Sequence, residues 1–168
     1  MRRLMVLAFL AGLVLIPSTA RGQISVGAQG NWASRRDFGL GARATLDLSP
    51  KRVPVAVFAT YDYFWPNSPP GINQDYWELN FNGVFARPVY GGQGQTYFGL
   101  GLNVAHAKGT SVVSGQVEES TNYGLNILGG SKFYSGHLAP FFEIRYTAWS
   151  SDQLVFTIGV DLMLVMFD

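Results

Sequence analysis

Residues 38–48 have the sequence FGLGARATLDL, in which an apolar side chain stands at every second position. Successive side chains of a β-strand point to opposite faces, so this period predicts a strand with one apolar face and one polar face. The polar face carries two glycines together with Arg43, Thr45 and Asp47. Such a strand separates an apolar environment from a polar one.

The same alternation recurs along the rest of the chain and predicts eight strands. Consecutive strands joined by turns favour an all-β fold, an up-and-down antiparallel barrel. The predicted strands cover residues 24–32, 38–48, 53–63, 77–86, 97–104, 122–133, 142–147 and 154–164.

The composition narrows the class of protein. The chain has 168 residues, which is one domain's length, and charged residues make up 14% of it, against about 25% in soluble domains. Twelve Lys and Arg against eleven Asp and Glu give no basic field for nucleic acid. Because the chain has no cysteine, disulfides, thiolate metal sites and a cysteine nucleophile are excluded.

The first residues have the pattern of an export signal. Two arginines precede an apolar run from residue 4 to residue 16, which Pro17 ends, and small residues follow. This run is too short for a membrane-spanning helix, which needs about 20 residues, but it suits a cleaved signal peptide. We expect cleavage after Ala20 or Gly22, so that residues 1–22 are the signal peptide and residues 23–168 form the barrel.

The apolar face is expected to point outward. An eight-stranded barrel is narrow and holds small side chains and paired charges, whereas the many Leu, Phe and Trp side chains would not fit inside it. The connections 49–52, 90–94 and 135–137 are short or glycine-rich, and the connections 67–75 and 108–121 are long. Outer-membrane barrels have short periplasmic turns and longer outer loops, so both long connections are expected outside the cell.

Two segments carry a resemblance to a known family. Residues 97–102 (YFGLGL) and 140–146 (PFFEIRY), together with the strand pattern, resemble the small eight-stranded outer-membrane β-barrels of Gram-negative bacteria, the OmpX-, OmpA-barrel- and opacity-protein-like group. The resemblance implies a bacterial outer-membrane location, contact with outer-membrane lipid and lipopolysaccharide, and assembly by the barrel-assembly machinery. These proteins often end on an aromatic residue, whereas here Phe167 is penultimate.

The polar faces of the predicted strands place several charges inside the barrel. Buried charges must be paired, because an unpaired one costs several kcal/mol, so we expect ion pairs that plug the lumen, centred on Glu143, Arg145 and Asp161. Asp62 and Glu78 are expected to face each other. The predicted interior charges are Arg43, Asp47, Asp62, Glu78, Lys132, Glu143, Arg145 and Asp161.

A second group of charges is expected at the outer rim. Arg35, Arg36 and Lys108 lie in or near the outer connections. They are either contacts for lipopolysaccharide phosphates or simply solvated charges.

The leading functional hypothesis is a structural or interaction protein of the cell surface. The alternatives are a narrow ion or solute channel and, less favoured, a soluble periplasmic binder, since Gly30-Asn31-Trp32 matches a short lipocalin signature. Lipid A deacylases of this barrel size use a histidine with a serine two residues later, and neither His106 nor His137 has one. We therefore predict no enzyme activity, no catalytic residue, no metal and no cofactor, and the surface partner stays open.

Overall fold

The computed structural model describes residues 23–48, 54–67, 70–89 and 93–166. The predicted signal peptide, the connection 49–52, most of the connection 90–94 and the penultimate Phe167 lie outside these residues. Among the described residues, no helix has both the length and the apolar character needed to cross a bilayer.

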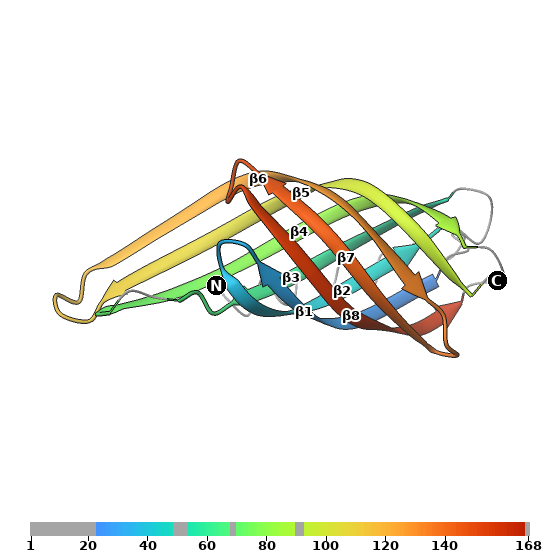
Figure 1. Ribbon diagram of the computed structural model, residues 1–168, viewed down its shortest axis with the longest axis horizontal. Helices are drawn as coiled ribbons and strands as arrows, with labels where there is room; N and C mark the ends of the chain where they lie inside the picture. The colour runs from blue at the N-terminus through green and yellow to red at the C-terminus, as the bar shows by residue number, and fades with distance from the viewer. Residues whose placement is uncertain (1–22, 49–53, 68–69, 90–92, 167–168) are drawn as a thin grey trace.

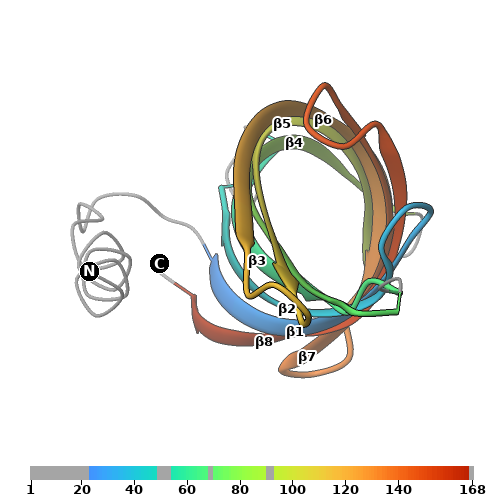
Figure 2. The ribbon, with the colours of Figure 1, turned by 90° about the vertical axis from the view of Figure 1, so that its left-hand side faces the viewer.

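Eight antiparallel strands close into one barrel (Figures 1 and 2). Each strand pairs with its neighbours in the sequence, and β1 closes the ring by pairing with β8. The strands are β1 (Gln23–Ala33), β2 (Asp37–Asp47), β3 (Val55–Phe64), β4 (Ile72–Pro88), β5 (Gly94–Ser111), β6 (Val117–Phe133), β7 (Leu138–Ala148) and β8 (Gln153–Met166).

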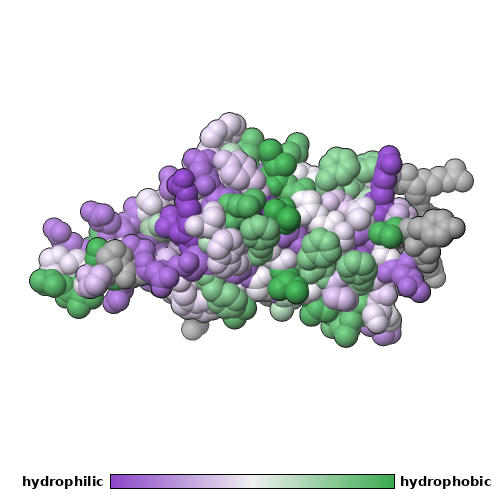
Figure 3. All heavy atoms as spheres, viewed as in Figure 1, coloured by the Kyte–Doolittle hydropathy of each residue, from purple (hydrophilic) through white to green (hydrophobic). Residues whose placement is uncertain are grey.

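The burial pattern follows the predicted alternation, and the apolar face of each strand points outward as predicted. Large apolar side chains cover the outside; Phe98 and Leu100, for example, are 65% and 66% exposed. Polar side chains fill the inside. Figure 3 shows the apolar side chains gathered over the barrel. A continuous apolar exterior of this extent is incompatible with water and is the lipid-facing surface of a transmembrane barrel.

Inward-facing glycines make room for the side chains of neighbouring strands. A Cβ atom on Gly27 would overlap the Asp161 carboxylate, and one on Gly41 would overlap the Asp62 carboxylate. Each of these glycines is the register partner of the residue whose side chain fills the space. Inside the ring, these polar side chains therefore lie against glycine on the next strand.

Three strands continue beyond the rest of the barrel (Figure 1). The β3–β4 ladder begins at Phe64↔Tyr76 and the β6–β7 ladder begins at Leu125↔Ala148, so the first residues of β4 and β6 lie outside the closed ring. Residues 72–75, 106–111 and 117–124 form a three-stranded sheet that we call the arm.

The arm corrects the prediction of two long loops. Residues 72–75, 108–111 and 117–121 were expected in loops, but they are paired strands, and residues 112–116 make the only unpaired connection between β5 and β6. The arm projects beyond the closed ring, so neither of its faces lines the lumen and alternation between apolar and polar side chains is not required there. A strand in this position has the polar composition of a loop.

Candidate functional sites in the lumen and beside the arm

The eight predicted interior charges all lie inside the barrel. Each of these residues is at most 7% exposed, and five of them are at most 1% exposed. They come from six of the eight strands, so their side chains meet across the lumen rather than along one wall.

Arg145 lies between two carboxylates. Its guanidinium contacts Asp62 at 3.3 Å and Glu78 at 3.0 Å, and all three side chains are fully buried. Asp62 and Glu78 are register partners on β3 and β4, as expected, and Arg145 on β7 supplies the cation that joins them. The remaining carboxylate lone pairs accept hydrogen bonds from neutral side chains, namely Gln29, Asn31, Thr60 and Asn80 to Asp62, and Tyr76 and Gln153 to Glu78.

A second group surrounds Arg43. Its guanidinium contacts Glu143 at 2.7 Å, and the Tyr97 hydroxyl donates to the same carboxylate oxygen at 3.0 Å. The guanidinium carbon also lies 4.2 Å from the ring centres of both Phe58 and Phe141. Phe58 interrupts the polar face of its strand in the sequence, and this stacking on a buried arginine is the reason that an aromatic ring fits there.

A third pair joins Lys132 to Asp161 at 2.5 Å. Glu143, Arg145 and Asp161 were expected to form a single centre, but each belongs to a different group. Each of them pairs with a residue on a strand that is not hydrogen-bonded to its own: Glu143 with β2, Arg145 with β3 and β4, and Asp161 with β6.

Two clusters of apolar side chains also lie inside the barrel. Phe64, Tyr76 and Val155 pack with Ala33 and Ala105 at the arm end, next to Glu78, to which the Tyr76 hydroxyl donates at 2.6 Å. Phe58, Val84, Tyr97 and Leu128 pack with Ala56 and Ala86 farther along. Two cavities beside Lys132 measure about 10 Å³ each, which is the space for one water molecule at most.

The sequence did not identify the neutral part of this network. The Asn80 carboxamide oxygen accepts from Asn103 and Asn126, and the Thr147 hydroxyl donates to Asn126 at 2.9 Å. Asparagine is unfavourable in strands, so repeated asparagines on the polar faces were the available signal.

The three predicted basic rim residues have different surroundings. Arg35 is exposed and forms no ion pair with the described residues. Lys108 pairs with Glu119 at 3.2 Å. Arg36 turns over the Tyr76 ring, with its guanidinium carbon 4.3 Å from the ring centre, so it faces the mouth of the barrel.

The structure brings one histidine to a hydroxyl that the sequence did not indicate. His106 Nδ1 lies 3.0 Å from the Thr121 hydroxyl on β6, and its ring stacks on Trp77. Among the described residues, no carboxylate bonds the imidazole, which lacks the orienting group of a hydrolytic triad. Within the same residues, no cluster of three or more His, Asp or Glu side chains is arranged to hold a metal ion.

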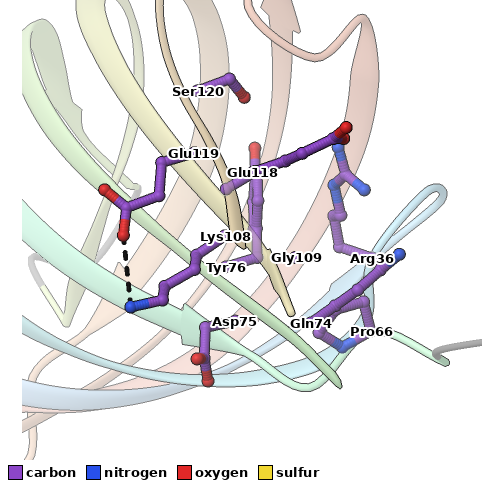
Figure 4. Close-up of a pocket in the computed structure, with 11 residues that line it drawn as sticks. Arg36, Pro66, Gln74, Asp75, Tyr76, Lys108, Gly109, Glu118, Glu119 and Ser120 are labelled. Carbon is purple, nitrogen blue, oxygen red and sulfur yellow. Dashed lines mark ion pairs between the residues drawn. The ribbon is translucent and has the colours of Figure 1, made fainter. Parts of the chain in front are cut away.

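A cavity of about 500 Å³ lies where the arm meets the rim (Figure 4). Its lining comes from five parts of the chain: the β1–β2 turn, the β3–β4 connection, the beginnings of β4 and β6, and the end of β5. Arg36, Tyr76, Lys108, Glu118 and Glu119 supply its titratable side chains, together with Asp75.

Comparison with protein-family models gives no match, and comparison with curated protein sequences gives none. Solved structures do match. Ail, the attachment invasion locus protein of Yersinia pestis, aligns over 85% of this chain and 97% of its own, with a TM-score of 0.60 and 15% identity; it has also been solved in complex with the heparin analogue sucrose octasulfate.

Two further structures agree. Neisserial surface protein A (NspA) aligns over 85% of this chain and 97% of its own, with a TM-score of 0.60 and 13% identity. The N-terminal β-barrel domain of Pseudomonas aeruginosa OprF aligns over 85% and 99%, with a TM-score of 0.55 and 15% identity. At these identities the likeness concerns the fold, and it confirms the predicted class: this chain has the fold of the small bacterial outer-membrane β-barrels.

Proposed function

We propose that this outer-membrane barrel is a sealed structural scaffold that presents the arm at the cell surface. The buried ion pairs inside the barrel are the observation that carries the proposal. Arg145, Asp62 and Glu78 cross the lumen as one buried group, and the Arg43–Glu143 and Lys132–Asp161 pairs occupy other parts of it. A permeating ion would have to separate such pairs, and breaking a buried pair is costly.

The narrowness of the barrel supports the same proposal. Eight strands enclose an interior that side chains fill, and the Phe64–Tyr76–Val155 cluster covers the polar network at the arm end. The competing hypothesis of a soluble binder requires the opposite arrangement, with apolar side chains inside and polar ones outside.

The arm lies on the outer side of the membrane in this proposal. At the opposite end the β6–β7 connection is short, with Gly136 in the left-handed region (φ 60°) and a bridge between Ser135 and Leu138. Short turns belong to the periplasmic side of outer-membrane barrels and the longer projections to the outer side.

Lipid and lipopolysaccharide are the immediate partners. The exposed apolar side chains contact the acyl chains, and Arg35, which is exposed and unpaired among the described residues, contacts lipopolysaccharide phosphates. Lys108 is a weaker candidate, because Glu119 already neutralises it. Assembly by the barrel-assembly machinery stays a prediction.

Conductance across a planar bilayer tests the sealed lumen. The purified barrel is expected to add no steady conductance, and a steady wild-type conductance that changes in Glu143→Gln or Arg145→Gln would favour a channel instead. The heat-dependent shift of the folded band on SDS gels identifies preparations in which the barrel has inserted.

Cysteine labelling tests the orientation, because the chain has no cysteine of its own. Ser114→Cys lies at the tip of the arm, and Ser135→Cys, the matched control, lies in the β6–β7 turn; both serines are exposed. A maleimide that cannot cross the membrane is expected to label intact cells of the first variant only. Labelling of the second variant alone would invert the orientation.

A further inference from the structure

The cavity beside the arm is a trough with a floor of small side chains. Ala107 and Gly109 lie on the inner face of β5, the central strand of the arm, and both line the cavity. A Cβ atom on Gly109 would meet nothing within 4 Å. The trough therefore exists because the central strand carries small residues between two strands that carry larger ones.

The register of the arm defines the two walls of the trough. Gly109 pairs with Gln74 on one side and Glu118 on the other, and Ala107 pairs with Tyr76 and Ser120. The Glu118 row thus lies at the outer end of the trough and the Tyr76 row at the inner end. The two rows are two residues apart, which is about 7 Å along a strand.

The inner end holds a cation. The Arg36 guanidinium lies over the Tyr76 ring, and the Tyr76 hydroxyl donates to Glu78 at 2.6 Å, so the buried network fixes the ring against which Arg36 packs. Arg36 Nε is buried without a hydrogen-bond partner. Among the described residues, Arg36 also has no carboxylate within ion-pair distance.

The outer end holds an anion. Glu118 is exposed and forms no ion pair with the residues that the structure describes. Figure 4 shows its carboxylate extending toward the side of the trough on which Arg36 lies, while Lys108 and Glu119 pair with each other on the other side. Asp75 accepts a hydrogen bond from the Tyr63 hydroxyl at 2.7 Å. Among the described charged residues that line the trough, Arg36 and Glu118 are the two that form neither an ion pair nor a side-chain hydrogen bond.

We propose that the trough binds a small zwitterion of the size of a dipeptide. The carboxylate of the ligand accepts from the Arg36 guanidinium, its ammonium group donates to Glu118, and its backbone lies over Gly109 and Ala107. An extended dipeptide spans about 7 Å, which is the backbone distance between the Glu118 row and the Tyr76 row. The inference does not depend on whether the lumen conducts.

The balance of charge argues against an anionic ligand. Asp75, Glu118 and Glu119 line the cavity against two cations, Arg36 and Lys108, so a phosphate or sulfate group would meet more carboxylates than cations. A ligand with one charge of each sign leaves this balance unchanged. It places its negative group beside Arg36 and its positive group beside Glu118.

Titration calorimetry of the full folded chain in lipid nanodiscs tests the proposal, with Ala-Ala as the probe. Blocking either end of the dipeptide, as N-acetyl-Ala-Ala or as Ala-Ala-amide, is expected to weaken binding about tenfold, because one charge-assisted hydrogen bond is lost. In the Glu118→Gln variant, Ala-Ala and N-acetyl-Ala-Ala should bind with equal affinity. In the Arg36→Gln variant, Ala-Ala and Ala-Ala-amide should bind with equal affinity.

Two further variants complete the experiment. Gly109→Leu, whose Cβ atom meets nothing within 4 Å, fills the trough and should abolish binding while the barrel keeps its heat-dependent gel shift. Arg35→Gln is the matched control and should leave the affinity of Ala-Ala unchanged, because Arg35 does not line the cavity. The proposal is wrong if inorganic phosphate or spermidine binds more tightly than Ala-Ala, if Gly109→Leu binds normally, or if Ala-Ala shows no saturable binding.

Discussion

Replacing Arg145 by methionine removes the cation from the largest charged group in the lumen. The substitution keeps an unbranched, although shorter, apolar chain and leaves Asp62 and Glu78 buried opposite each other, with neither ion pair of 3.3 and 3.0 Å. Loss of one partner from a buried ion pair costs about 3–5 kcal/mol. Asp62 keeps four neutral hydrogen-bond donors and Glu78 keeps two. We therefore expect the free energy of unfolding to fall by about 3 kcal/mol, the lower end of that range.

Urea unfolding in phospholipid vesicles, followed by tryptophan fluorescence, measures this loss. Adding Glu78→Gln to Arg145→Met removes one of the two unpaired carboxylates. The double variant should therefore have a free energy of unfolding about 1 kcal/mol higher than that of Arg145→Met alone. Lys108→Met is the control, because the Lys108–Glu119 pair is exposed and its loss should cost less than about 1 kcal/mol. An Arg145→Met barrel within about 1 kcal/mol of the wild type would refute the view that this group stabilises the fold.

Three smaller predictions use the same unfolding assay. Gly41→Ala pushes a methyl group into the Asp62 carboxylate and should cost about 1–3 kcal/mol, whereas Gly83→Ala meets nothing within 4 Å and should stay within about 0.5 kcal/mol; equal effects would contradict the assigned packing. Tyr97→Phe loses the hydroxyl that donates to Glu143 and should cost about 1–2 kcal/mol, and an unchanged midpoint would mean that water replaces it. Val113→Ser alters a side chain that is 93% exposed at the tip of the arm and should change nothing within about 0.5 kcal/mol, so a clear loss would reveal a contact of the tip with the barrel.

The number of strands and the direction of their faces could be predicted from the sequence. Lipid on one side and a narrow lumen on the other impose the period of two at every level of the barrel. The polarity of residues such as Arg43 and Leu46 therefore indicates which of them faces the lumen and which faces the lipid. Beyond the closed ring this constraint is absent, and the alternation no longer predicts strands. Glu118 and Glu119 are consecutive and both polar, since water lies on both sides of the arm, and they were assigned to a loop.

The partners inside the lumen could not be predicted in the same way. Glu143 and Arg145 are two residues apart on one face of β7, yet one contacts Arg43 on β2 and the other contacts Asp62 on β3 and Glu78 on β4. Which residues meet depends on the stagger between strands and on the reach of each side chain. Neither quantity is encoded in the alternation of a single strand.

The open edges of the arm have a consequence for local unfolding and for proteolysis. Ile72–Asp75 pair only with β5, and Val117–Gly124 only with β5, whereas the strands of the ring are hydrogen-bonded on both sides. Local opening therefore begins in the arm and stops where the β3 and β7 ladders start. A protease that cuts between Val112 and Gln116 nicks the chain but leaves the ring closed, so that the projecting part can be trimmed away while its base stays in the membrane.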